Sequence, residues 1–220
     1  MTHRYKLVSF ALCPFVQRSV ILLTHKQIPH EIEYIDLADK PEWFLAAVPT
    51  GKVPALFIGD TVLFESAVIN EFLDETTPPP TLASDPIARA KERAWISYAE
   101  KLIFEQYHMM IAAEPDEYEH KKKVFIEGMV KLECVAMDFP ANEARFNLLD
   151  ASIAPLFTRT KITASVYQEL KITVRTNSPL IRWIDALTAR EEVKHSVPEN
   201  FETAWQDYFQ SRNSHYFQVN

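Results

Sequence analysis

The spacing of hydrophobic residues follows one pattern up to about residue 76 and another after it. In the first part, apolar runs of strand length occur at residues 7–10, 53–58 and 61–64, and apolar and polar residues alternate over 30–36. Between these runs, apolar residues recur at helical spacing, which predicts helices over residues 14–26, 41–45 and 66–76. Gly59-Asp60 predicts a hairpin between the last two strands. The predicted order is strand, helix, strand, helix, two strands and a helix.

After residue 76 the pattern predicts only helices. Pro78-Pro79-Pro80 ends the preceding helix and forms a stiff connector, because proline fixes φ and cannot donate a helical hydrogen bond. Asp85-Pro86 caps a long helix, and Asn147 with Asp150 has the spacing of a capping box that opens another. Further helices are predicted over residues 117–137, 180–189 and 201–209. We therefore expect an α/β domain over residues 1–77, a linker over 78–84 and an all-helical domain over 85–220.

Composition and charge narrow the possible partners. The 220 residues carry a net charge of −7, and their basic residues cluster only at Lys121-Lys122-Lys123, in a polar helical stretch. Nucleic acid is therefore not an expected partner, because phosphate binding needs clustered positive charge. Only Cys13 and Cys134 are present, and the seven histidines lack metal-ligand spacing, so we expect neither a disulfide framework nor a metal site. With no apolar run of membrane-spanning length, the sequence favours a reducing, cytoplasmic location without membrane association.

The strongest chemical signal is the segment that joins the first strand to the first helix. Pro14 suits the first position of a helix, which places Cys13 at or next to the N-cap. Free backbone N–H groups and the positive end of the helix dipole favour a thiolate there, so we expect Cys13 to be ionised near neutral pH. The alternative is a buried structural cysteine. The strand before Cys13 and the proline after it favour the reactive interpretation, whereas Cys134 is interpreted as a core residue.

The predicted order of elements resembles a thioredoxin-like arrangement. A thioredoxin-like half joined to an all-helical half resembles the cytosolic glutathione transferases, and residues 5–76 resemble their omega class. Each matching motif is weak alone, but their order and spacing together are specific. These motifs are Cys13-Pro14-Phe15-Val16-Gln17-Arg18, Lys40-Pro41-Glu42-Trp43-Phe44, Val53-Pro54 and Glu65-Ser66. Phe146-Asn147-Leu148-Leu149-Asp150-Ala151 also resembles the capping-box helix of the family's second domain.

The resemblance implies a role for the cysteine and its neighbours. Cys13 would form a mixed disulfide with glutathione, and Phe15 would line the site. The backbone of Val53 would pair with the cysteinyl part of glutathione, and Pro54 would be a cis-proline, an uncommon feature that a structure can test directly.

The resemblance also implies partners for the charged ends of glutathione. Lys40 would contact the glycine carboxylate, Glu65 the γ-glutamyl ammonium, and Ser66 the γ-glutamyl carboxylate. Ser66 stands at a predicted helix N-terminus, where free N–H groups favour an anion. Glu65-Ser66 alone would favour a plain helix cap, but its place directly after the predicted hairpin favours the binding role. Four residues at the end of the long helix are candidates for the electrophile pocket, although such a cluster on a helix is more often part of the core: Tyr107, His108, Met109 and Met110.

The function implied is that of a glutathione transferase enzyme of the omega type, a thiol transferase or reductase. Its substrate classes would be dehydroascorbate, mixed disulfides and S-phenacyl-type glutathione adducts, and glutathione would be its cosubstrate. No second cysteine follows Pro14-Phe15, so the mechanism would be monothiol, with glutathione resolving the mixed disulfide. The resemblance also implies a homodimer and weak conjugation of aryl halides.

Three alternatives stay open at the level of sequence. The first is a non-enzymatic binding protein resembling the stringent starvation protein, against which Cys13, Lys40, Glu65 and Ser66 argue. The second is a protein similar to the chloride intracellular channels, which Pro41-Glu42-Trp43 and the charged first helix disfavour. The third is an isomerase or ether-cleaving enzyme on the same fold.

Overall fold

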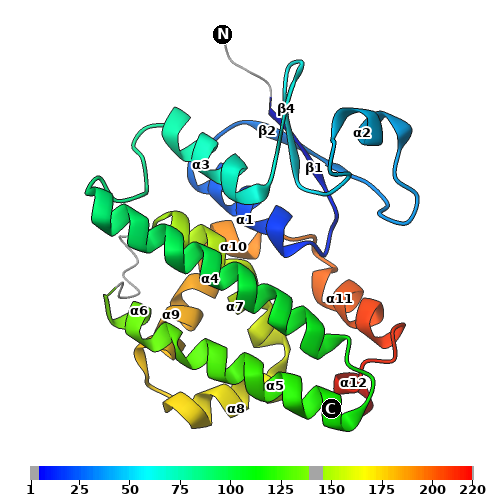
Figure 1. Ribbon diagram of the computed structural model, residues 1–220, viewed down its shortest axis with the longest axis vertical. Helices are drawn as coiled ribbons and strands as arrows, with labels where there is room; N and C mark the ends of the chain where they lie inside the picture. The colour runs from blue at the N-terminus through cyan, green and yellow to red at the C-terminus, as the bar shows by residue number, and fades with distance from the viewer. Residues whose placement is uncertain (1–4, 139–145, 220) are drawn as a thin grey trace.

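The computed structural model describes residues 5–138 and 146–219. Its strands all lie before residue 65, and helices alone follow among the described residues. The sheet contains β1 (Tyr5–Ser9), β2 (His30–Tyr34), β3 (Ala55–Ile58) and β4 (Thr61–Phe64). Helices α1 (Pro14–His25), α2 (Glu42–Ala47) and α3 (Ser66–Thr76) accompany it. This α/β unit lies at the top of Figure 1, with the helical part of the chain below it. The predicted thioredoxin-like fold class, with a helical second half, is confirmed.

The sheet is mixed and is covered on both faces. Its strand order is β2-β1-β3-β4; β1 and β2 are parallel, whereas β3 is antiparallel to both β1 and β4. Because side chains alternate along a strand, Leu7 and Val8 point to opposite faces. Leu7 belongs to the large core with α1 and α3, whereas Val8 packs with Phe44 of α2. The sheet is therefore a central layer that holds the ends of its strands in fixed positions.

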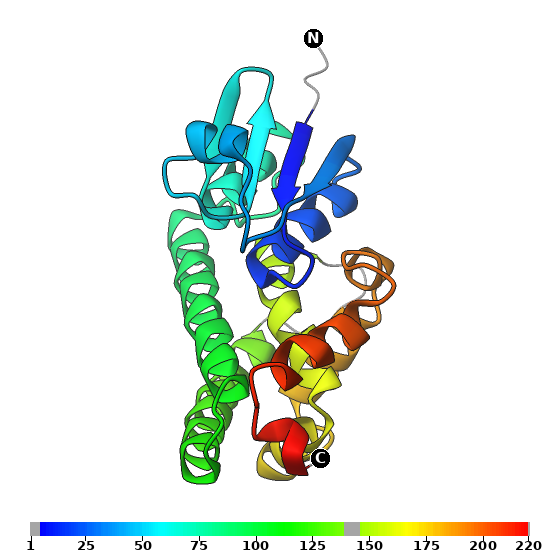
Figure 2. The same cartoon turned by 90° about the vertical axis from the view of Figure 1, so that its right-hand side faces the viewer.

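The helical part is built around α7 (Leu148–Ile162), which lies against α1 and also contacts α4 (Pro86–Met110) and α9 (Pro179–Thr188). The capping box predicted at its start is present: Asn147 Oδ1 accepts from the Asp150 N–H at 2.9 Å, and Asp150 Oδ2 accepts from the Asn147 N–H at 3.0 Å. In Figure 2, α4 (green) lies on one side of α7 and α11 (Phe201–Gln210, orange-red) on the other. The remaining helices are α5 (Pro115–Val130), α6 (Leu132–Asp138), α8 (Ala164–Val174), α10 (Glu191–Lys194) and α12 (Tyr216–Val219).

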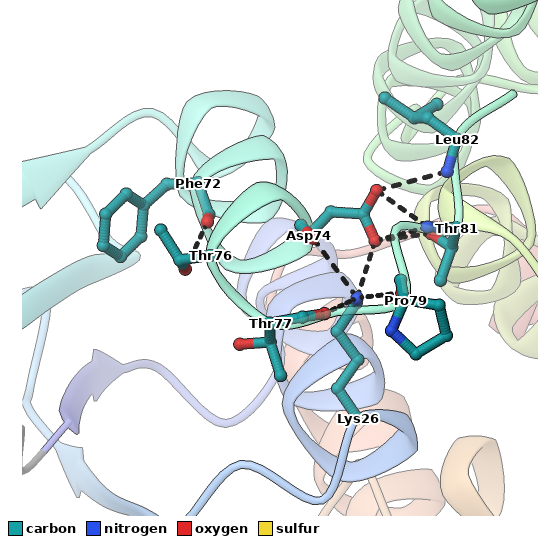
Figure 3. Close-up of polar contacts among 8 residues, drawn as sticks. All are labelled: Lys26, Phe72, Asp74, Thr76, Thr77, Pro79, Thr81 and Leu82. Carbon is teal, nitrogen blue, oxygen red and sulfur yellow. Dashed lines mark hydrogen bonds and ion pairs between the residues drawn. The ribbon is translucent and has the colours of Figure 1, made fainter. Parts of the chain in front are cut away.

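A buried ion pair fixes the segment that leads from α3 to α4 (Figure 3). Lys26 Nζ lies 2.9 Å from Asp74 Oδ1, and both side chains are almost completely buried. The same ammonium donates to the carbonyl oxygens of Thr77 and Pro79, at 2.5 and 2.9 Å. The Asp74 carboxylate accepts from the backbone N–H of Thr81 at 2.8 Å. One lysine at the end of α1 therefore holds the end of α3 and the following connector together.

Two features of the helical part differ from the prediction. The single helix expected over residues 117–137 is two helices, α5 and α6, divided at Lys131. The division lets α5 pack on α4 while α6 turns to pack on α9. Helices α8, α10 and α12 were not expected, because they are short or bury few side chains. The predicted domain boundaries at residues 77 and 85 stay a prediction.

Candidate active site

The sheet register brings the predicted glutathione-site segments to one end of the sheet. Val8 pairs with Ala55, and Ala55 pairs with Phe64. The end of β1, the start of β3 and the end of β4 therefore lie side by side. After β1 the chain continues into the segment that contains Cys13. Val53-Pro54 directly precedes β3, and Glu65-Ser66 directly follows β4. Segments that are far apart in the sequence are thus neighbours in space.

Cys13 occupies the predicted position at the N-cap of α1, with Pro14 at the first helical position. The residue is partly buried and lines a cavity of about 230 Å³. Burial raises the pKa of the Cys13 thiol, and this effect exceeds the opposing effects of the Val16 and Phe15 N–H groups and of the Arg159 and Arg18 charges. The expectation that Cys13 is ionised near neutral pH in the free protein was therefore wrong.

The peptide bond between Val53 and Pro54 is cis, which confirms the prediction made for it. Pro54 is buried and Val53 partly buried. Glu65 is exposed and has a φ of +64°, a conformation that residues other than glycine adopt rarely and that is frequent at functional sites. Lys40, partly buried, precedes α2. The binding roles of Lys40, Val53, Pro54, Glu65 and Ser66 stay predictions.

Ser66 opens α3 and is in contact with a buried arginine that the sequence analysis did not assign to the site. The Ser66 hydroxyl accepts a hydrogen bond from Arg18 Nε at 2.8 Å. Arg18 Nη2 also lies 3.5 Å from Glu100 Oε2 on α4, and its guanidinium carbon lies 5.1 Å from the centre of the Phe15 ring. Nη1 of Arg18 is buried without a hydrogen-bond partner. The end of the sheet therefore already holds a positive charge behind Ser66.

The cavity beside Cys13 lies between the α/β unit and helices α4, α7 and α11, and its wall is mostly apolar and aromatic. Tyr107 and Met110 line it as predicted, whereas the exposed His108 and the buried Met109 are not among the lining residues. Phe15 also lines it, with its ring centre 5.3 Å from that of Phe104. The lining residues that the sequence analysis did not find are Phe10, Leu12, Leu37, Ile103, Phe104, Gln106, Arg159, Trp205, Tyr208 and Phe209.

Arg159 of α7 connects the helical part of the chain to the segment that carries Cys13. The side chain is buried, and its Nη2 donates to the Leu12 carbonyl oxygen at 2.9 Å. Its Nη1 donates to Gln17 Oε1 at 2.5 Å and to the Pro155 carbonyl oxygen at 2.9 Å. Gln17 in turn donates to Ser196 Oγ at 3.0 Å. These bonds fix the turn on both sides of Cys13.

Two further observations bear on other candidate sites. Cys134 is exposed, so its interpretation as a core residue was wrong; its Sγ lies 2.9 Å from the Lys131 carbonyl oxygen. Within residues 5–138 and 146–219, no three His, Cys, Asp or Glu side chains are grouped in a way that could hold a metal ion. The same residues include no helix with the length and apolar character that crossing a membrane requires.

Comparison with known proteins adds independent observations. Residues 12–76 match the model of the glutathione S-transferase N-terminal domain. Pyrimidodiazepine synthase of Drosophila melanogaster is 42% identical over 113 residues, which are 49% of this chain and 43% of that protein. A probable glutathione S-transferase DHAR2, chloroplastic, of Oryza sativa subsp. japonica is 40% identical over 74 residues, 34% of this chain and 27% of that protein. The chain thus matches less than half the length of these two curated relatives.

The similarity in structure extends over most of the chain. Glutathione transferase Omega 3C from Trametes versicolor superposes with a TM-score of 0.75 and 27% sequence identity, covering 89% of each chain. The chain belongs to the glutathione transferase superfamily. Within this superfamily it is omega-like, as the sequence motifs predicted. The similarity in structure therefore extends well beyond the matched family model, which ends at residue 76.

Proposed function

We propose that this chain is a glutathione-dependent thiol transferase or reductase in which Cys13 forms a mixed disulfide with glutathione. The observation that carries the proposal is the position of Cys13 at the junction of two different surroundings. On one side lie the cis Val53–Pro54 bond and the start of α3; on the other lies the aromatic cavity. A thiol at such a junction can contact both a bound glutathione and the group attached to the glutathione sulfur.

The charges at the end of the sheet suit a zwitterionic tripeptide with two carboxylates. Ser66 stands at the N-terminus of α3, where free N–H groups favour an anion, and Arg18 lies directly behind its hydroxyl. The exposed Glu65 can take the ammonium group, and Lys40 the second carboxylate. The superfamily's use of glutathione supports this arrangement.

The proposed reaction is two successive thiol–disulfide exchanges. The Cys13 thiol loses its proton to solvent, and the thiolate attacks the glutathionyl sulfur of a mixed disulfide. That disulfide bond breaks, and the other sulfur leaves as a thiolate that is then protonated. A second glutathione thiolate attacks the new Cys13–glutathione disulfide, which releases oxidised glutathione and restores Cys13. Cys13 is the only cysteine near the cavity among the described residues, so glutathione supplies the second thiol.

The cavity wall supports an aromatic substituent on the glutathione sulfur. Phe10, Phe15, Phe104, Tyr107, Trp205, Tyr208 and Phe209 all line it. Planar groups pack favourably against such rings. Among the substrate classes implied by the omega resemblance, this wall favours S-phenacyl-type adducts over the small, polar dehydroascorbate. For these adducts, the Cys13 thiolate would attack the glutathionyl sulfur and the carbon–sulfur bond would break. The leaving carbanion, stabilised as an enolate, would take a proton and leave as the ketone.

Turnover of defined substrates tests this proposal. We expect release of the free ketone from S-phenacylglutathione in the presence of reduced glutathione, with retention of activity in Cys134→Ser and loss of it in Cys13→Ala. Retention on a glutathione affinity column without any such turnover would contradict the enzymatic proposal and would favour the binding-protein alternative. The homodimer and the cytoplasmic location also stay proposals, which size measurement in solution and localisation of the full-length protein would test.

A further inference from the structure

Arg159 is unusual among the buried charges of this protein. Its side chain donates to Gln17 Oε1 and to the carbonyl oxygens of Leu12 and Pro155, and its guanidinium carbon lies 5.0 Å from the centre of the Phe201 ring. All of these partners are neutral. Within the described ranges, Arg159 forms no ion pair with a carboxylate. A buried charge is costly unless an opposite charge or a set of hydrogen bonds compensates it.

The other arginine beside Cys13 is compensated differently. Arg18 Nη2 lies 3.5 Å from Glu100 Oε2, and its charge also interacts electrostatically with that of Glu65. Among the residues that the structure describes, no such group balances the charge of Arg159, and the titratable group that interacts with it is the Cys13 thiol. Burial lowers the pKa of Arg159 to about 10, so its side chain stays protonated at neutral pH. It therefore supplies a permanent positive charge to the wall of the cavity, close to Cys13.

We propose that Arg159 is a positioning residue that stabilises the Cys13 thiolate from the helical part of the chain and favours negatively charged aromatic groups in the cavity. The inference rests on the proposed function, because it assigns Arg159 a part in the reaction of Cys13. During exchange, the negative charge moves from the Cys13 sulfur to the leaving sulfur inside the cavity. Arg159 lines the same cavity and can stabilise the charge at both ends of this transfer.

The other titratable groups around Cys13 do not replace Arg159 in this role. The charge of Arg18 on α1 is partly compensated by Glu100 of α4 and by Glu65. Tyr107 of α4 and Tyr208 of α11 line the cavity. Burial raises the pKa of Tyr208, which therefore stays neutral over the range from pH 6 to 8. Of the lining residues within the described parts of the chain, Arg159 is thus the one whose removal takes a permanent charge away from the cavity.

Rates of reaction with two aromatic disulfides of different charge test the proposal. These rates are measured in the Cys134→Ser background, in which Cys13 is the single thiol. The neutral reagent is 4,4′-dithiodipyridine, and the dianionic reagent is 5,5′-dithiobis(2-nitrobenzoate). In Arg159→Gln we expect a higher thiol pKa. If the pKa of the Cys13 thiol is about one unit higher, the thiolate fraction is about tenfold lower and each thiolate is about threefold more nucleophilic. The neutral reagent then reacts about threefold more slowly. The dianionic reagent loses more, and Arg159→Lys restores most of both rates.

Lys161→Gln is the matched control, because Lys161 also lies on α7 but its ammonium pairs with Asp185 at 2.9 Å on the surface. We expect it to leave both rates unchanged. Equal slowing of both reagents in Arg159→Gln, without recovery in Arg159→Lys, would show that Arg159 only holds the turn and would overturn the proposal. Unchanged rates in Arg159→Gln would also overturn it.

A second measurement needs no change at Arg159 and so does not depend on the folding of that variant. The ratio of the dianionic to the neutral rate is measured for Cys13 in Cys134→Ser and for the exposed Cys134 in Cys13→Ala. We expect a higher ratio at Cys13, and an equal or lower ratio contradicts the proposal. Because neither reagent contains glutathione, failure here differs from failure of the glutathione reaction itself.

Discussion

The Cys13 thiol is subject to opposing effects from its own helix and from the rest of the chain. The N–H groups at the start of α1 and the nearby arginines favour the thiolate, whereas burial disfavours any charge. The sequence could predict the first effect, because Pro14 places Cys13 at a helix N-terminus. It could not predict the second, because the burial comes from segments such as α4, α7 and α11, whose packing on Cys13 leaves no local pattern.

The reactivity of Cys13 should therefore depend steeply on pH. A group whose pKa is raised is protonated below that pKa, so the thiolate fraction increases about tenfold for each pH unit. In the Cys134→Ser variant, we therefore expect the rate with a neutral disulfide to rise about a hundredfold from pH 6 to pH 8, without a plateau. Stopped-flow absorbance measures this rate, and a plateau below pH 7 would show that the thiol is already ionised.

Ser66 should contribute directly to glutathione affinity. Its hydroxyl lies at the start of α3 in contact with Arg18, where it is suited to bind a carboxylate. A hydrogen bond to a charged group contributes about 1.5–3 kcal/mol, so we expect Ser66→Ala to weaken binding of reduced glutathione roughly tenfold or more. Calorimetric titration measures this affinity, with the exposed Ser211 as Ser211→Ala for control. Equal affinities for glutathione in the two variants would show that the Ser66 hydroxyl does not bind it.

Among the contacts between elements, we expect the loss of the Lys26–Asp74 pair to lower the stability of the fold most. It joins the ends of α1 and α3 to the segment before α4, and both side chains are buried. The pKa of Asp74 is set by burial, which raises it, and by hydrogen bonds from Lys26 and Thr81, which together lower it below its ordinary value. The carboxylate therefore stabilises the fold at neutral pH, and this contribution is lost as the pH falls through the lowered pKa.

Asp74→Asn should destabilise the protein strongly, because it leaves the buried Lys26 charge without its opposite charge. We expect a loss of about 3–5 kcal/mol in the free energy of unfolding by urea at pH 7. Glu71→Gln is the matched control on the same helix, since Glu71 pairs with Arg93 at the surface, and its effect should stay within about 1 kcal/mol. Similar losses in the two variants would mean that the buried pair contributes no more than a surface pair.

The elements themselves could be predicted where local signals are strong. The hairpin at Gly59-Asp60, the capping box at Asn147 and the proline-led start of α4 each have a short sequence signature, and all three are present. The break at Lys131 could not be predicted, because hydrophobic spacing continues through it and the direction changes to meet α9. Helix α8 was missed because only Val166, Tyr167 and Leu170 are buried along it.

In the whole molecule, the candidate site combines a part that the sequence could predict with a part that it could not. The glutathione end rests on motifs within residues 13–66, and the sheet register brings their segments together. The cavity is built by side chains from α4, α7 and α11 as well, such as Phe104, Arg159 and Trp205. The spacing of these residues marks them only as parts of amphipathic helices, so their convergence on Cys13 becomes visible only in three dimensions.

Formation of the mixed disulfide is the most direct test of the proposed function. The Cys134→Ser variant is incubated with oxidised glutathione at pH 8, and its intact mass is compared with that of the Cys13→Ala, Cys134→Ser double variant. We predict that the protein with Cys13 gains the mass of one glutathionyl group and loses it when reduced glutathione is added, while the double variant stays unchanged. The absence of this adduct on Cys13 in the folded protein would contradict the proposed function.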